Sequence, residues 1–179
     1  MSKNLEIVQK TSKVLGILSK IGYICSIVGA ILCLVGIADL VVANGNPEIV
    51  AKIQESAKLT VKQTIGACVV GLVYCISAIL VTKWHMNYFL MEQKEGTPFT
   101  EEGARAFRTL GIVNIVVPFS AVIIASILEA IFKCPHEARP DVSFGLGIAM
   151  ILLSFVFAYG AELEKKKAEK KEIAKDKDK

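Results

Sequence analysis

The chain alternates between long uncharged apolar stretches and short polar segments. Four stretches carry no Asp, Glu, Lys or Arg, at residues 21–38, 64–82, 109–128 and 142–161, and they are 18, 19, 20 and 20 residues long. A helix needs about 20 mainly apolar residues to cross a hydrocarbon core of about 30 Å. None of the stretches has the polar face that a helix in a soluble core would show. The pattern therefore predicts an all-α integral membrane protein with four transmembrane helices, at about 14–43, 63–92, 108–132 and 142–162.

These helices would use most of the chain. We predict a single four-helix membrane domain over residues 1–164, followed by a lysine-rich cytoplasmic tail over 165–179. The composition agrees, because 53% of the residues are hydrophobic and the mean hydropathy is +0.52. The first uncharged stretch is longer than the apolar region of a signal peptide, which has about 7–15 residues, and no convincing cleavage site follows it. We therefore expect the first span to be retained.

The sharpest local signal is the polar break between the second and third spans, residues 95–102. Gly96 can adopt the positive φ that ends a helix, and Pro98 prevents that helix from continuing. Thr100 is a suitable N-cap for the next helix. Phe99 is large for such a turn, so it packs under the helix ends, enters the membrane interface or faces a partner. We treat this segment as a candidate partner-contact corner made of Gly96, Pro98, Phe99 and Thr100.

The connection between the first two spans also predicts structure. Asn46 is a suitable N-cap and Pro47 a suitable first helical residue. Apolar residues then recur every four positions, which is typical of an amphipathic helix. We expect a short outer helix at about 48–62.

The distribution of Lys and Arg predicts the orientation. Sixteen of the 21 basic residues lie in the N-terminal segment, the middle connection and the tail, against five in the other two connections. Because basic residues favour the cytoplasmic side, both termini are predicted to be cytoplasmic. The net charge of +4 does not indicate direct nucleic-acid binding, since eight basic residues are gathered in the tail without aromatic neighbours. The tail instead offers a candidate anionic-lipid contact at Lys165, Lys166, Lys167, Lys170 and Lys171.

The first span contains small residues at alternating spacings of three and four. Such a face lets membrane helices approach closely. It would serve either another span of the same chain or a second copy in a homo-oligomer. We name it the small-residue seam, and it comprises Ser19, Gly22, Ser26, Gly29, Cys33 and Gly36.

Few residues within the predicted spans are polar or would distort a helix. Asn114 is the main polar side chain inside the third span, where it marks a pathway or hydrogen-bonds a neighbouring helix. Pro118 predicts a kink in the same span. Asp39 lies near the outer end of the first span, where it can reach water.

The sequence shows no catalytic pair, cofactor motif or metal-ligand set. Cys134 and His136 are too few ligands for zinc, for which four are usual. The other cysteines lie within the predicted spans and match no redox motif. His85 and His136 are expected in different loops on opposite sides of the membrane. We therefore predict that the chain is not an enzyme and has no cofactor or metal.

Two stretches resemble a known family. One is GTPFTEE at 96–102 with Arg105, Arg108 and Leu110 after it, and the other runs from FGL at 144–146 to FAYGAEL at 157–163. They are similar to the central loop and the last span of the small bacterial four-span membrane proteins catalogued as domain of unknown function 2975. That family has no established activity. The resemblance implies a bacterial cell membrane location and a role beside a small cytoplasmic helix-turn-helix regulator.

The leading functional hypothesis is a non-catalytic integral membrane protein, the membrane component of a regulatory or protein-interaction pair. The alternative is a subunit of a small transporter or conduit, for which Asn114, Pro118 and Asp39 are the motivation. Proton and ion relays usually need ionisable residues in mid-span, and these are lacking here. A membrane thiol enzyme is the weakest of the three hypotheses.

Overall fold

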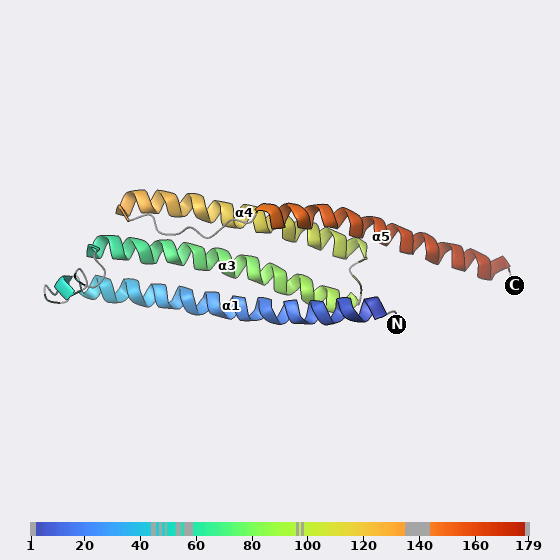
Figure 1. Ribbon diagram of the computed structural model, residues 1–179, viewed down its shortest axis with the longest axis horizontal. Coiled ribbons are helices and arrows are strands. Elements are labelled where there is room, and N and C mark those ends of the chain that lie inside the picture. The colour runs from blue at the N-terminus through green and yellow to red at the C-terminus, as the bar shows by residue number, and fades with distance from the viewer. Residues whose placement is uncertain are drawn as a thin grey trace. The chain divides into compact units, whose positions relative to one another are not determined.

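The computed structural model describes residues 3–43, 46, 48, 50–52, 55, 59–95, 97, 99–134 and 144–177. These residues form helices and contain no strand. In chain order the helices are α1 (Lys3–Ala43), α3 (Val61–Glu95), α4 (Glu101–Phe132) and α5 (Phe144–Lys177), as Figure 1 shows. Each of the four is long and apolar enough to cross a membrane. The prediction of an all-α chain with four membrane-length helices is confirmed, and we treat the chain as a multi-pass membrane protein.

The outward surfaces of the helices are apolar. Leu32 and Val42 on α1, for example, are 65% and 81% exposed. Acyl chains are as apolar as leucine, so exposing such side chains to the bilayer interior costs no free energy. In water the same surface would be a large aggregation-prone patch.

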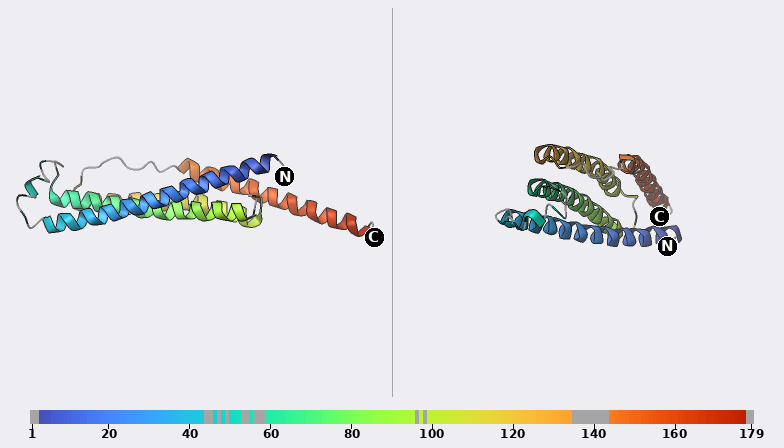
Figure 2. Two further views of the ribbon diagram at one scale, coloured as in Figure 1. Left: turned by 90° about the horizontal axis from the view of Figure 1, so that it is seen from below. Right: turned by 60° about the vertical axis from the view of Figure 1, so that its left-hand side comes forward.

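Two helices extend furthest beyond the predicted spans. α1 begins at Lys3 and includes the basic segment that precedes the first span. α5 continues through the lysine-rich tail to Lys177 as one helix, which can be followed in Figure 2. After Gly160 the tail contains neither glycine nor proline and is rich in Glu, Lys and Ala, all good helix formers.

Six of the fifteen positions of the predicted outer helix, and Pro47 before it, lie outside the described residues. At its start, the Glu48 N–H donates to Asn46 Oδ1 at 3.1 Å, as an N-cap interaction requires. α4 runs through Pro118 without interruption.

The chain packs as two compact units, and each is described by itself. The corner unit comprises Met1–Ser19, Trp84–Ile115 and Ser143–Lys179. The seam unit comprises Lys20–Lys83 and Val116–Val142.

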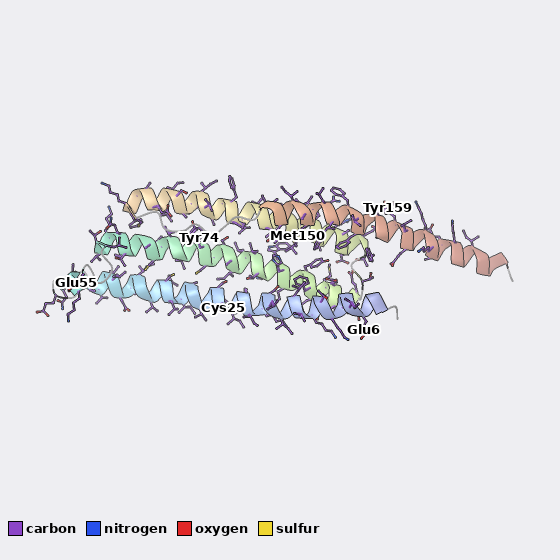
Figure 3. The ribbon with its side chains drawn as sticks, in the orientation of Figure 1. Glu6, Cys25, Glu55, Tyr74, Met150 and Tyr159 are labelled. Carbon is purple, nitrogen blue, oxygen red and sulfur yellow. The ribbon has the colours of Figure 1, made fainter. Side chains whose placement is uncertain are left out.

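The core of the corner unit joins three helices. Tyr88 of α3, Leu110 of α4 and Met150 of α5 are buried together, and Met150 is labelled in Figure 3. The ring centroids of Tyr88 and Phe107 are 5.1 Å apart, and those of Phe107 and Phe157 are 5.0 Å apart. Further partly buried side chains complete the cluster, namely Phe89, Met91 and Ala106.

Within the corner unit, α4 and α5 approach each other at a pair of glycines. A Cβ atom added to Gly111 would lie 2.8 Å from the carbonyl oxygen of Gly147. A Cβ atom added to Gly147 would lie 3.0 Å from the carbonyl oxygen of Gly111. Because backbone atoms cannot move aside as side chains do, both positions require glycine for this packing.

In the seam unit, α1 and α3 pack with small residues against glycines. At each contact a Cβ added to the glycine would lie 3.1 to 3.6 Å from a side-chain atom of the other helix. A step forward along α1 is matched by an equal step backward along α3, so the helices are antiparallel in one constant register. The pairs are Gly22 with Thr82, Gly29 with Cys75, Cys33 with Gly71, and Gly36 with Cys68.

A second set of contacts in the seam unit, made of hydrogen bonds, joins the start of α3 to the end of α4. Lys133 has φ 55°, and the Cys134 N–H donates to the Glu129 carbonyl at 3.1 Å, which is a Schellman-type helix end. Gln63 Nε2 donates to the Lys133 carbonyl at 2.9 Å, and Cys134 Sγ donates to the Gln63 carbonyl at 3.2 Å. Thr60 and Gln63 form a reciprocal capping box that begins α3.

Candidate functional site

The predicted corner is a capped helix start. Thr100 Oγ1 accepts a hydrogen bond from the Gly103 N–H at 2.8 Å, and the Thr100 carbonyl accepts from the Ala104 N–H at 2.9 Å. The Thr100 hydroxyl also donates to a carboxylate oxygen of Glu95, the last residue of α3. Thr100 is therefore the N-cap of α4, and its hydrogen bond to Glu95 links α4 to the end of α3. Gly96 and Pro98 of the same corner lie outside the described residues.

Phe99 packs onto α5. Its ring meets the Phe157 ring edge-on, with centroids 5.6 Å apart and planes at 89°. The ring also covers Gly160, where a Cβ atom would lie 2.6 Å from Phe99 Cδ1. Phe99 nevertheless remains 37% exposed. The side chain is thus partly engaged within the chain and partly open to its surroundings.

A groove of about 550 Å³ with a mixed lining lies at the α3 end of the corner. The last two turns of α3 and the first turn of α4 form it. Its lining mixes amide, apolar, basic and acidic side chains, namely Asn87, Leu90, Met91, Lys94, Glu95 and Glu102.

The corner unit also contains a buried polar contact between α1 and α3. Ser12, 3% exposed, donates its hydroxyl proton to Glu92 Oε2 at 3.2 Å. Gln93 Nε2 donates to the Ser12 carbonyl at 3.5 Å, and it lies 3.1 Å from where a Cβ on Gly16 would stand. Ser12 and Gly16 continue the spacing of three and four that the seam shows from Ser19 onward, so the sequence carried a signal for them.

Asn114 connects three helices of the corner unit. Its Nδ2 donates to the Leu110 carbonyl at 2.8 Å on its own helix. The same nitrogen lies 3.4 Å from His85 Nε2 on α3 and 3.7 Å from Met150 Sδ on α5. This arrangement is the inter-helix contact that the sequence allowed for. The expectation that His85 lies in a loop was wrong, because α3 extends to Glu95 and places the ring beside Asn114.

The candidate lipid-contact lysines lie on the extension of α5. Lys165, Lys166, Lys167 and Lys170 are exposed and helical, while the side chain of Lys171 is outside the described part of the chain. Exposed lysines at the end of an apolar helix can reach an anionic surface.

The residues of the small-residue seam have two roles: four pack against α3, and two form hydrogen bonds within α1. Gly22, Gly29, Cys33 and Gly36 face α3, as given above. Its two serines bond their own helix: Ser19 Oγ donates to the Leu15 carbonyl and Ser26 Oγ to the Gly22 carbonyl, both at 2.8 Å.

The described residues hold no group of three or more His, Cys, Asp or Glu side chains that could bind a metal ion. All five cysteines are free thiols. Burial raises the pKa of the Cys134 thiol, with Glu129 as a second cause. A raised pKa keeps the thiol protonated, and the thiolate is the nucleophile.

Comparisons of the chain with protein-family models, with curated proteins and with solved structures found no match.

Proposed function

We propose that this chain is a non-catalytic integral membrane protein and the membrane component of a regulatory or protein-interaction pair. The observation that carries the proposal is the extension of α5 beyond its apolar stretch, from Glu162 to Lys177. Its described side chains from Glu162 to Lys170 are exposed. A charged helical surface outside the membrane-length segment is available to a partner without rearrangement of the bundle.

The proposed orientation places both termini in the cytoplasm of a bacterial cell. The excess of Lys and Arg in the terminal segments and the middle connection supports this orientation. The resemblance to the domain of unknown function 2975 family supports the bacterial cell membrane as the location. In this orientation the predicted short helix at 48–62 lies on the outer side.

The proposed docking region combines the corner and the extension of α5. The groove beside the corner displays Lys94 together with Glu95 and Glu102, and the α5 extension is rich in lysine. Such a surface suits a partner of mixed charge, which we propose to be a small cytoplasmic helix-turn-helix regulator. Another membrane protein or a second copy of the chain is the alternative partner. We propose no direct contact of this chain with nucleic acid.

The transporter or conduit alternative rests on Asn114, Pro118 and Asp39. Asn114 hydrogen-bonds within the corner unit to Leu110 and approaches Met150 and His85. These contacts account for an amide inside an apolar helix without a transported species. For a thiol enzyme, Cys134 gives no support, because burial raises the pKa of its thiol.

Co-purification from native membranes tests the proposal. The full chain should retain a cytoplasmic protein that is lost when Lys165, Lys166, Lys167 and Lys170 are replaced by Gln. These positions are exposed, so the free energy of unfolding, measured by melting in detergent, should stay within about 0.5 kcal/mol of that of the parent chain. A matched control replaces exposed Lys10 and Lys13 of α1 by Gln and should keep the partner. If both multiple variants retain the same proteins as the parent chain, the proposed docking role of α5 is wrong.

A further inference from the structure

Arg108 stands at the edge of the apolar part of α4. The uncharged stretch of that helix begins at the next residue, Thr109. On the neighbouring helix α5, Arg108 contacts Ser154, which lies eight residues before Glu162, the first charged residue after the apolar stretch. Eight helical residues correspond to about 12 Å. The guanidinium is therefore drawn alongside an uncharged segment of α5.

Two residues of α5 hold the guanidinium in a fixed position. Arg108 Nε donates to Ser154 Oγ at 3.3 Å, and Ser154 is fully buried. The Ser154 hydroxyl donates its own proton to the Ile151 carbonyl at 2.6 Å, so its oxygen is free to accept from the arginine. The Cζ atom lies 4.5 Å from the centre of the Phe155 ring, a cation–π contact. The planar group is thus oriented before any ligand arrives.

No carboxylate balances this charge within the part of the chain that the structure describes. The ion pair between Lys10 and Glu6, at 2.8 Å, lies far away near the N-terminal end of the sequence. After the bond to Ser154, the two terminal nitrogens of Arg108 still carry four N–H donors. A cation beside an apolar helix segment is costly unless an anion pairs with it.

Exposed apolar side chains follow one face of α5 next to this cation. Phe155, Leu152 and Ile148 lie at spacings of three and four, with Tyr159 one turn further toward the charged end, as labelled in Figure 3. An acyl chain can lie along Leu152 and Ile148 while its headgroup meets the arginine. This combination of a fixed guanidinium and an apolar stripe matches a phospholipid, since guanidinium binds phosphate with two parallel hydrogen bonds.

We propose that Arg108, positioned by Ser154 and Phe155, binds the phosphate of an anionic phospholipid whose acyl chain lies along α5. This site differs from the tail lysines, which begin ten residues and about 15 Å beyond Phe155 along α5. It concerns lipid recognition by the membrane-embedded helices and does not depend on the proposed protein partner.

The test uses the full chain purified in a non-ionic detergent. Phosphatidylglycerol and phosphatidylcholine with identical acyl chains are titrated separately, and the rise in melting temperature gives a half-saturating lipid concentration. Arg108→Gln removes the charge and the donors, and Arg108→Lys keeps the charge but loses the planar fork. Arg105→Gln is the matched control, because Arg105 is exposed, lies one turn away and makes no side-chain contact with α5 among the interactions described above.

We expect phosphatidylglycerol to stabilise the parent chain and Arg105→Gln at the same concentrations. For Arg108→Gln the half-saturating concentration should rise at least about tenfold, the loss expected when a hydrogen bond to a charged group is removed. Arg108→Lys should bind with intermediate affinity and keeps the proposal testable if Arg108→Gln does not fold. Phosphatidylcholine should stabilise all variants equally and less strongly.

Three results would overturn the proposal. The first is an Arg108→Gln or Arg108→Lys titration that coincides with that of Arg105→Gln. The second is equal stabilisation of the parent chain by the two lipids. The third is stabilisation of the parent chain by inorganic phosphate or glycerol phosphate at the same concentrations, which would assign the arginine to a soluble anion.

Discussion

Cys33 of α1 lies against Gly71 of α3, with its sulfur 3.3 Å from the position that a Cβ on Gly71 would occupy. One turn away the arrangement is reversed. Gly29 precedes Cys33 by four residues on α1, Cys75 follows Gly71 by four residues on α3, and the Cys75 sulfur lies 3.1 Å from the Cβ position of Gly29. Each helix thus offers a sulfur to a glycine of the other. Because the contacts repeat at one register, sliding α1 along α3 would place side chains where only hydrogen fits.

Substitution of Gly29 tests this packing. Gly29→Leu places a branched side chain against Cys75 and should destabilise the chain by about 1–3 kcal/mol, the usual cost of overpacking. Ile31→Leu is the control, since Ile31 is exposed and should change stability by no more than about 0.5 kcal/mol. Melting in detergent measures both variants. Equal melting temperatures would show that this face does not need glycine.

The corner offers a separate test at Thr100. Thr100→Ala removes the acceptor for the Gly103 N–H and the donor to Glu95, and it should cost about 1 kcal/mol or slightly more. Thr100→Ser keeps both hydrogen bonds and should behave as the parent chain within about 0.5 kcal/mol. The comparison is made by detergent melting. A Thr100→Ser variant as unstable as Thr100→Ala would mean that the methyl group, and not the cap, matters.

The proposed orientation predicts where reporters will be found. Reporter fusions or labels at Gly96 and Lys170 should be cytoplasmic, and those at Gly45 and His136 should be on the outer side, because Lys and Arg are concentrated in the terminal segments and the middle connection. Fusions after each position, assayed with one reporter active inside and one active outside, measure this. A fusion at Gly96 that reports outside would contradict the four-span orientation.

The sequence predicted the helices well because their signal is local. Uncharged stretches of 18 to 20 residues identify membrane-length helices without knowledge of their neighbours. The seam was visible for the same reason, as a spacing of small residues along one helix. The start of α3 carried a further local signal, the Thr60–Gln63 capping box, at the end of the segment predicted to be amphipathic.

The contacts between helices were beyond the sequence because they depend on pairs of distant residues. Gly71 receives Cys33, and Gly147 meets Gly111, only once a register between two helices is fixed. Nothing local distinguishes these glycines from others in apolar stretches. The pairing of Ser12 with Glu92 joins residues 80 positions apart and likewise needs the fold.

The candidate lipid site shows the same limit. Arg108 could be read as one more basic residue of the middle connection. Its proposed role depends on Ser154, a serine inside an apolar stretch, and on Phe155 beside it. An uncharged helix becomes a partner for a cation only when another helix brings that cation alongside.

Phe99 and Gly160 allow the two explanations of the corner to be separated. Phe99→Ala removes the edge-on contact with Phe157 and should destabilise the chain by about 2 kcal/mol, less than the 3–5 kcal/mol typical of a fully buried phenylalanine. Gly160→Ala should cost about 1–3 kcal/mol, because its Cβ would lie 2.6 Å from Phe99 Cδ1. In the double variant the clash is gone, so Gly160→Ala should cost little when added to Phe99→Ala.

This non-additivity is the decisive measurement, since residues in contact show coupling energies of about 0.5–3 kcal/mol. Detergent melting of the four chains gives the coupling, and co-purification of a cytoplasmic protein is followed in parallel. If the corner is structural, any loss of the partner should follow the loss of stability across the series. If Phe99 instead contacts a partner, Phe99→Ala should leave the melting temperature nearly unchanged and still abolish co-purification. Additive stability effects of Phe99→Ala and Gly160→Ala would contradict the packing of Phe99 on α5, because two residues in direct contact cannot act independently.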